Sequence, residues 1–244
     1  GMERNVFKEY NNIITISNRS KNSLKNVYNV EDKNIKVFPI GIDDKKFNPS
    51  NRSEQIREKY GNNILLYSGL MLPRKRVPVL LEAMTNVIKE IPDVHLILTG
   101  KGRLLNDYKK LAKTLGIQNN TSFLGFVEDN ELLKFYASCD IFVFPSWREG
   151  FGQAILEAMA SGTPVICADM PPMSEIVGNG GLTFKQDDSK DLAKKIIQLL
   201  NNRDELARLR ENALTKVKEY SWIQIAKGYY DYLRLMINYP KNRS

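Results

Sequence analysis

Short apolar runs alternate with segments of helical length from about residue 64 to about residue 200, and this alternation constrains the fold more than any other feature. The runs lack a helical period, which is typical of strands buried in a parallel sheet. The segments between them supply the crossovers that parallel strands need. The pattern predicts an α/β fold with a doubly wound parallel sheet, which binds ligands at the carboxyl ends of its strands. The expected strands are Ile64–Ser68, Val94–Thr99, Ser122–Leu124, Ile141–Phe144, Val165–Ala168 and Leu182–Phe184, and the expected helices are Val79–Glu90, Leu104–Leu115, Asn130–Ala137, Gln153–Ala160 and segments near 190–200, 204–219 and 222–237.

One strand-to-helix turn carries the most chemistry. After the strand 141–144 come Glu149 and two glycines, Gly150 and Gly152, and a helix is expected from about Gln153. Glycine lets the backbone approach a ligand closely, and the unpaired N–H groups of a helix start attract phosphate. A second acid, Glu157, lies further along the same helix. Two acids on either side of a phosphate site fit the hydroxyls of two sugars joined through a diphosphate, as in a nucleotide-sugar.

This stretch resembles the signature of the retaining, family-4 type glycosyltransferases (glycosyl transferases group 1) of the GT-B fold. Further blocks of that family follow in the expected order, and the resemblance runs from about residue 35 to about residue 225. It implies a Rossmann-like sheet that forms the C-terminal, donor-binding half of a GT-B fold. The further blocks are Gly69 followed by Lys75, Leu98-Thr-Gly100-Lys-Gly102, Phe123-Leu-Gly125-Phe, Ala137-Ser-Cys-Asp140, Gly162-Thr-Pro164-Val, and Glu175 before Gly180-Gly181.

The resemblance implies roles for the residues around the turn. Glu157 would accept hydrogen bonds from the ribose hydroxyls of the donor, and Glu149 would contact the transferred sugar near the reacting centre. Their alternative interpretations are a solvent-exposed helix acid and an acid that is favoured only by the nearby helix dipole. The backbone of residues 150–152, Gly150, Phe151 and Gly152, would offer N–H groups to the β-phosphate and the sugar.

Lys75 corresponds to the family's lysine on the diphosphate, where a fixed cation meets the growing charge of the leaving group. Where the family usually has Gly-Arg, this chain has Gly69-Leu70, so one guanidinium is missing from the phosphate site. Arg74 or Arg76 would have to replace it, and either could instead face solvent.

The outer parts of the donor site are implied by the same resemblance. Lys101 follows a strand and would brace the nucleotide, although a tight strand-to-helix turn explains this loop equally well. The backbone near Phe126 and Val127 would hold the base. Recognition by backbone leaves no readable code for uracil, guanine or adenine. The donor expected for a chain that resembles this family is a UDP- or GDP-linked sugar.

No metal or other cofactor is expected. The Asp pairs at 43–44 and 187–188 fall in turn-like segments, and no Asp-x-Asp stands at a strand end to hold Mg²⁺ or Mn²⁺. The GT-B resemblance likewise implies a metal-independent reaction. His95, the single histidine, lies inside an expected strand and is interpreted as a core or edge residue rather than as an acid or base.

The beginning of the chain differs from the rest. Residues 11–17 and Ile35–Phe38 are expected to form strands, with a short helix Ser20–Val27 between them. By resemblance, residues 1–40 are a remnant of the N-terminal Rossmann domain and linker, residues 41–220 form the nucleotide-sugar-binding domain, and residues 221–244 form a helix that packs toward the missing N-terminal domain. Apolar residues at helical spacing predict a buried face on that helix, after a capping box at Ser221–Gln224. Without the N-terminal domain, a homodimer through the exposed strand or this helix is expected.

Composition limits the remaining possibilities. A net charge of +8 favours an anionic partner, but the basic residues are scattered and no nucleic-acid-binding signature is present. No apolar run approaches the roughly 18 residues of a membrane span, and no secretory signal opens the chain. Cytoplasmic location is therefore expected, with peripheral contact to a membrane that carries a lipid-linked acceptor as an extension. Cys139 and Cys167 are expected to be buried free thiols.

The sequence thus predicts the donor-binding domain of a glycosyltransferase that moves a hexose, with retention, from a nucleotide-sugar to a glycan or lipid-linked acceptor. The isolated chain is expected to bind nucleotide but to transfer poorly, because the acceptor groove belongs to the N-terminal domain. Two alternatives stay open at this point: a non-catalytic nucleotide-diphosphate-binding module, for which Leu70 marks lost chemistry, and a generic basic protein that binds polyanions.

Overall fold

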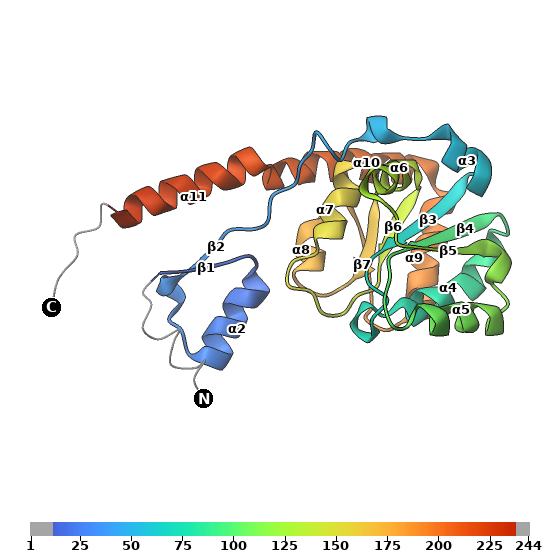
Figure 1. Cartoon of the computed structure of the whole chain (residues 1–244), viewed down its shortest axis with the longest axis horizontal. Coiled ribbons are helices and arrows are strands. Elements are labelled where there is room, and N and C mark those ends of the chain that lie inside the picture. The colour runs from blue at the N-terminus through green and yellow to red at the C-terminus, as the bar shows by residue number, and fades with distance from the viewer. Residues whose placement is uncertain (1–11, 238–244) are drawn as a thin grey trace.

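The computed structural model describes residues 12–237, in which a six-stranded parallel sheet dominates. Figure 1 shows helices on both faces of this sheet, with α4, α5 and α9 on one side and α6, α7 and α10 on the other. The sheet strands are β3 (Asn63–Ser68), β4 (Val94–Thr99), β5 (Thr121–Gly125), β6 (Ile141–Phe144), β7 (Val165–Ala168) and β8 (Gly181–Phe184). The helices around it are α3 (Glu54–Tyr60), α4 (Val77–Glu90), α5 (Leu105–Thr114), α6 (Asp129–Ser138), α7 (Gln153–Ala160), α8 (Met173–Val177), α9 (Ser189–Asn201) and α10 (Arg203–Val217).

The strand order, β5-β4-β3-β6-β7-β8, is that of a doubly wound sheet. The chain moves outward from β3 to β5, then returns across the sheet to β6 and moves outward in the opposite direction. The loops after β3 and β6 therefore diverge at the centre of the sheet. This position is the switch point of the sheet, where such folds bind ligands. This confirms the α/β, Rossmann-like fold expected from the sequence, including strand 94–99 with the predicted bounds.

Burial explains why these runs form the sheet. All four residues of β6 and all four of β7 are buried, as a central strand covered on both faces requires. Close packing also accounts for one glycine block: a Cβ on Gly181 would lie 2.0 Å from the carbonyl oxygen of Val165 on the neighbouring strand. Cys139 and Cys167 are buried and free, as expected.

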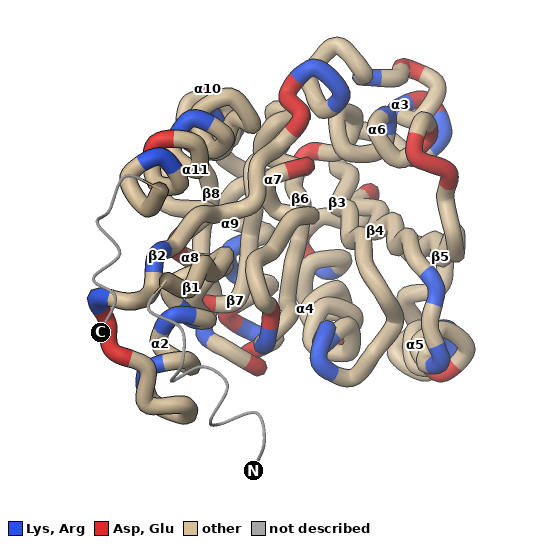
Figure 2. The backbone as a smooth tube through the Cα atoms, turned by 60° about the vertical axis from the view of Figure 1, so that its left-hand side comes forward, with Lys and Arg blue, Asp and Glu red and all other residues tan. Residues whose placement is uncertain are grey.

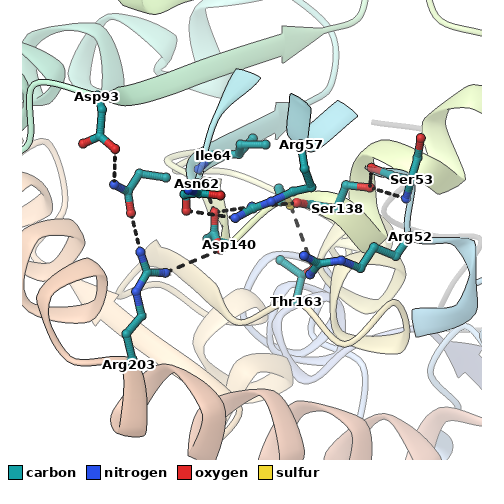
Figure 3. Close-up of polar contacts among 12 residues, drawn as sticks. Arg52, Ser53, Arg57, Asn62, Ile64, Asp93, Ser138, Asp140, Thr163 and Arg203 are labelled. Atoms are coloured by element: carbon teal, nitrogen blue, oxygen red, sulfur yellow. Dashed lines mark hydrogen bonds and ion pairs between the residues drawn. The ribbon is translucent and has the colours of Figure 1, made fainter. Parts of the chain in front are cut away.

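A buried ionic network ties together the amino ends of the two central strands (Figure 3). The Asp140 carboxylate, just before β6, accepts hydrogen bonds from the backbone N–H of Ile64 on β3 at 2.7 Å and from Arg57 at 2.6 Å. Arg203, at the start of α10, lies 3.7 Å from the other carboxylate oxygen and donates to Asn63 at 2.7 Å. The Ala-Ser-Cys-Asp140 block is thus structural, and it lies at the opposite end of the sheet from the diverging loops.

A second, smaller unit lies beside the sheet. β1 (Ile13–Thr15) and β2 (Ile35–Val37) form a two-stranded parallel sheet, joined by α2 (Asn18–Tyr28). In Figure 1 this unit stands apart from the main sheet, alongside α11 (Trp222–Ile237), which extends away from the body of the molecule. Short 3₁₀ turns complete the described chain at Asp32–Asn34, Pro49–Asn51, Pro73–Lys75, Gln118–Asn120 and Lys218–Tyr220. Residue 11, where the first strand was expected to begin, lies outside the described residues.

The predicted buried face of α11 is buried only in part in this structure. Ile225 is the buried residue of that helix, whereas Trp222 is 52% exposed and Leu233 is 49% exposed. The capping contact predicted at its start is present, with the Ser221 hydroxyl accepting from the N–H of Gln224 at 3.4 Å. Gly41 and Phe38 cover part of the apolar face of this helix, and the rest of that face is exposed.

Two chain segments connect the small unit and α11 to the main sheet, and they touch where they cross. The N–H of Ile42 donates to the carbonyl oxygen of Tyr220 at 2.8 Å, and Ile42 forms an isolated bridge with Ser221. Gly41 lies against the ring of Trp222, where a Cβ would come within 2.5 Å. Further along, the ring of Phe38 stacks on Tyr229 with 4.3 Å between centroids.

Candidate functional site

The loops after β3 and β6 form the candidate site at the centre of the sheet. The second loop ends at Gly152, which takes the N-cap position of α7 with a φ of 117° and offers no capping side chain. A side chain is strained at this φ, so glycine is required here. The first N–H groups of α7 are left for a ligand or water, as anion binding at a helix start demands.

Glu149 lies at the centre of a group of donors that come from both loops. Lys75 donates to its carboxylate at 2.6 Å, and the Nη1 atom of Arg74 lies 2.9 Å from both carboxylate oxygens. The Ser146 hydroxyl, which is fully buried, donates to the same carboxylate at 2.5 Å. The Nζ atom of Lys75 also lies 4.9 Å from the centroid of the Phe144 ring. Two of the predicted site residues, Glu149 and Lys75, are therefore in direct contact.

Contact between the two partners favours the charged form of each. Burial raises the pKa of the Glu149 carboxyl, but the hydrogen bonds from Lys75 and Ser146 and the charge of Lys75 outweigh burial, so its pKa is below the usual value. Burial lowers the pKa of Lys75, and contact with Glu149 opposes that shift. The lysine is only 8% exposed. Each charge depends on the other, because neither has full access to water.

The structure distinguishes the two arginines that could replace the guanidinium missing at Leu70. Arg74 contacts Glu149 and also donates to the carbonyl oxygen of Arg148 at 3.1 Å. Arg76 instead pairs with Asp187 at 2.6 Å and stacks on Trp147 at 5.4 Å. Arg74 is thus the arginine that lies at the candidate site.

Glu157 belongs to a separate set of contacts on α7. Its Oε2 atom accepts a hydrogen bond from the Tyr136 hydroxyl at 2.9 Å, and Tyr136 is fully buried. Burial raises the pKa of Glu157, while the Tyr136 hydrogen bond and the charge of Lys46 lower it by less. Lys46 itself pairs with Asp129 at 2.8 Å. The helix around Glu157 is largely buried, as predicted, but the two site acids share none of the hydrogen-bond donors described here.

The remaining predicted residues lie along the carboxyl edge of the sheet. Gly69 follows β3, and its N–H donates to the carbonyl oxygen of Thr99 at 3.2 Å. The Nζ atom of Lys101, after β4, lies 5.2 Å from the centroid of the Phe126 ring, after β5. Phe126 is 61% exposed, whereas Val127 packs against the core. Phe151 is buried and has its ring 6.2 Å from that of Tyr220.

A cleft of about 520 Å³ separates the Glu149 loop from the small N-terminal unit. One wall comes from β1 and α2, and the other from the loops that carry Arg74 and Glu149. Contacts at the start of α2 tie it to the main domain near α8: Asn18 donates to Glu175 on α8 at 3.3 Å, and Arg19 donates to the carbonyl oxygen of Pro171 at 3.3 Å. The lining residues are Thr15, Arg19, Ser20, Ser23, Leu24, Arg74, Arg148, Glu149 and Gly150.

Figure 2 shows Lys and Arg interspersed with Asp and Glu along the tube at α10 and α11, rather than in one continuous basic stretch. Within residues 12–237, no three His, Cys, Asp or Glu side chains come together as a metal-binding group. In the same part of the chain, no helix combines the length and the apolar character that a membrane crossing requires.

The fold is a Rossmann-like domain in which Glu149 precedes, and Glu157 lies on, a helix that starts without a side-chain cap after a central strand. Residues 50–216 match the family described as Glycosyl transferases group 1, and the chain belongs to this family. An uncharacterized glycosyltransferase of Methanocaldococcus jannaschii is 34% identical over 221 residues, which cover 88% of this chain and 57% of that protein. The MMP alpha-(1->4)-mannosyltransferase of Mycolicibacterium hassiacum is 30% identical, over 92% of this chain and 54% of the relative. The chain thus spans about half the length of these relatives.

Solved structures share the fold. The crystal structure of Anabaena Alr3699/HepE in complex with UDP matches with a TM-score of 0.86 and 24% identity, over 94% of this chain and 65% of that one. A glycosyltransferase from Rickettsia africae matches with a TM-score of 0.85 and 22% identity, over 97% of this chain and 67% of that one.

Proposed function

We propose that this chain is the donor-binding part of a retaining, metal-independent glycosyltransferase, which transfers a hexose from a UDP- or GDP-linked sugar to a glycan or lipid-linked acceptor. One observation carries the proposal: Glu149, Lys75 and Arg74 meet at the switch point of the sheet, next to the uncapped start of α7. Family membership and the UDP complex of the Anabaena protein support a nucleotide-sugar donor.

Different site residues would bind different parts of the donor. Lys75 and Arg74 would meet the charge of the diphosphate, and the N–H groups at Gly152 and the start of α7 would bind its oxygens. Arg74 would thereby replace the guanidinium that Leu70 lacks. Glu149, held in its charged form by these cations, would accept hydrogen bonds from the transferred sugar.

The nucleoside end of the donor would lie along the sheet edge. Glu157 would accept from the ribose hydroxyls, with Tyr136 orienting its carboxylate. The base would lie near Phe126 and Val127, with Lys101 beside it.

The division of the chain is part of the same proposal. Residues 1–40 would belong to the N-terminal Rossmann domain, residues 41–220 would form the donor domain, and the helix at 221–244 would pack back on the N-terminal domain. The exposed apolar side chains of α11, such as Ile223 at 82% exposure, are consistent with a covering partner. Without that domain the chain would bind the donor but transfer weakly.

A non-catalytic nucleotide-diphosphate-binding module is the second candidate. It is favoured by Leu70, which is 47% exposed and apolar at the position where the family carries a cation. The contact of Arg74 with Glu149 favours the catalytic reading, because it returns a guanidinium to the site.

The first experiment is a thermal-shift titration of the 244-residue chain with UDP, GDP and ADP. A nucleotide at one hundred times its Kd stabilises the fold by about 2.7 kcal/mol, which corresponds to about 5–11 °C for a chain of this size. Glu157→Ala should abolish the shift, whereas Glu82→Ala, which removes an exposed acid from α4, should leave it unchanged.

The outcomes separate the candidates. No shift with any nucleotide would refute donor binding by this chain. A shift that Glu157→Ala leaves intact would refute the assigned ribose contact. Transfer activity is then measured on a chain that includes an N-terminal domain: turnover that is lost with Lys75→Ala supports the enzyme, and tight nucleotide binding without turnover supports the binding module.

A further inference from the structure

The cleft beside Glu149 contains more positive than negative charge. Three arginines line it, Arg19 from α2 and Arg74 and Arg148 from the switch-point loops, against the single carboxylate of Glu149. That carboxylate is already bound by Arg74 and by Lys75. The one carboxylate in the cleft lining is therefore neutralised by Arg74 and Lys75, and the cleft lining supplies no carboxylate to pair with Arg19 or Arg148.

Arg19 and Arg148 have no carboxylate partner within residues 12–237. Arg19 donates one hydrogen bond, to the carbonyl oxygen of Pro171 at 3.3 Å, and no ion pair joins it to Glu175 of the adjacent groove. The side chain of Arg148 is exposed, and among the described residues it makes no hydrogen bond or ion pair. Guanidinium groups without a carboxylate partner, in a concave site, favour an anion with paired oxygens such as phosphate or carboxylate.

The other side chains of the cleft suit a sugar. Thr15, Ser20 and Ser23 place hydroxyl groups on the wall that β1 and α2 provide, opposite Glu149. Hydroxyls donate and accept, so they match the hydroxyls of a sugar ring. A volume of about 520 Å³ lies within the range of small-molecule sites.

We propose that the acceptor bound in this cleft is an acidic sugar, and that Arg19 and Arg148 bind its phosphate or carboxylate group. The inference rests on the proposed function, because it assigns this cleft to the acceptor of that reaction. It adds the chemical class of the acceptor and two residues that select it. The two arginines come from opposite walls, so an acidic group held by both spans the cleft beside Glu149.

The test is a ¹H–¹⁵N NMR titration of the 244-residue chain with glucose 6-phosphate, glucuronate and glucose. Each titration is run on the free chain and again with the nucleoside diphosphate that stabilises it at saturation. We expect at least one acidic probe to bind about ten-fold or more tightly than glucose, as hydrogen bonds to a charged group predict. Comparison of the two acidic probes identifies phosphate or carboxylate as the preferred group.

Three variants locate the effect. Arg19→Gln and Arg148→Gln should each weaken binding of the acidic probe by about ten-fold. Arg208→Gln removes the same charge from α10, outside the cleft lining, and should change nothing. Arg148→Gln keeps the test decisive if Arg19→Gln disturbs α2, because the Arg148 side chain holds no described element in place.

Three results would overturn the inference: equal binding of glucose and both acidic probes, unchanged binding in Arg148→Gln, or competitive displacement of the acidic probe by the nucleotide. The last would assign the arginines to the donor diphosphate. Failure of the proposed function is distinguishable, since it appears as a lack of nucleotide binding while the acidic probe still binds the free chain.

Discussion

Removal of the Asp140 carboxylate should be among the most destabilising single changes in this chain. The side chain is 7% exposed, and its partner Arg57 is 11% exposed. Asp140→Ala leaves the guanidinium with only carbonyl acceptors and leaves the buried N–H of Ile64 without its acceptor. Breaking a buried pair by removing one partner costs about 3–5 kcal/mol. At about 2–4 °C per kcal/mol for a chain of this size, a loss near 4 kcal/mol lowers Tm by about 8–16 °C.

Urea unfolding followed by far-UV circular dichroism measures this loss as a lower midpoint with an unchanged slope. Asp140→Asn should cost less than Asp140→Ala, because an amide oxygen still accepts from Ile64. The exposed pair Arg52–Glu54 supplies the control, with side chains 42% and 74% exposed, and Glu54→Ala should cost less than about 1 kcal/mol. If Asp140→Ala costs no more than Glu54→Ala, the network in Figure 3 does not stabilise the sheet and the reasoning fails.

Three further predictions concern the site. Burial raises the pKa of Glu157, so the folded chain loses stability as pH rises from the unfolded value of about 4.3 through the higher folded value. Glu157→Gln should remove this loss in thermal unfolding between pH 4 and 7, and an unchanged pH slope would contradict it. Glu149→Gln and Lys75→Met, alone and combined, should show a coupling free energy of about 1–3 kcal/mol in urea unfolding, because the pair is in contact and largely buried; a coupling near zero would show that the contact does not stabilise the fold. Gly152→Ala should cost at least about 1 kcal/mol because of its positive φ, and should lower nucleotide affinity. Gly150→Ala should cost less, because its Cβ would only make van der Waals contact with Ile16 at 4.0 Å; equal costs would contradict the strain argument.

The sheet could be predicted from the sequence because each central strand is an uninterrupted apolar run. The residues of β6 and β7 are apolar without interruption, and burial on both faces produces that pattern whatever the surrounding fold. The apolar face of α11 could be predicted from the sequence in the same way, but the extent of its burial could not. The helical spacing of apolar residues indicates that Trp222 and Leu233 share a face with Ile225. It does not indicate whether another segment packs against that face.

The two acids and the lysine of the site could be predicted from the sequence. The residues that contact them could be predicted less well. Glu149 and Lys75 lie in family blocks, and the structure places them 2.6 Å apart. The choice between Arg74 and Arg76 depends on the 3₁₀ turn Pro73–Lys75 and on the φ of 51° that Arg76 adopts directly after it, which the sequence does not indicate. Tyr136 was missed altogether, because its contact with Glu157 arises from the packing of α6 beside α7 and not from spacing along the chain.

The crossing of the two connecting segments determines how the cleft can change its width. The segments that contain Ile42 and Tyr220 are hydrogen-bonded to each other, so bending one of them strains or breaks its contact with the other. The small unit and α11 are joined to the main sheet through these two segments, so a rotation of both relative to the sheet would bend the chain at the crossing. The ring of Trp222 lies flush on Gly41 at this point, where a larger residue would prop the segments apart. A single methyl group added at residue 41 would act on the distance between α2 and Glu149 without touching either of them.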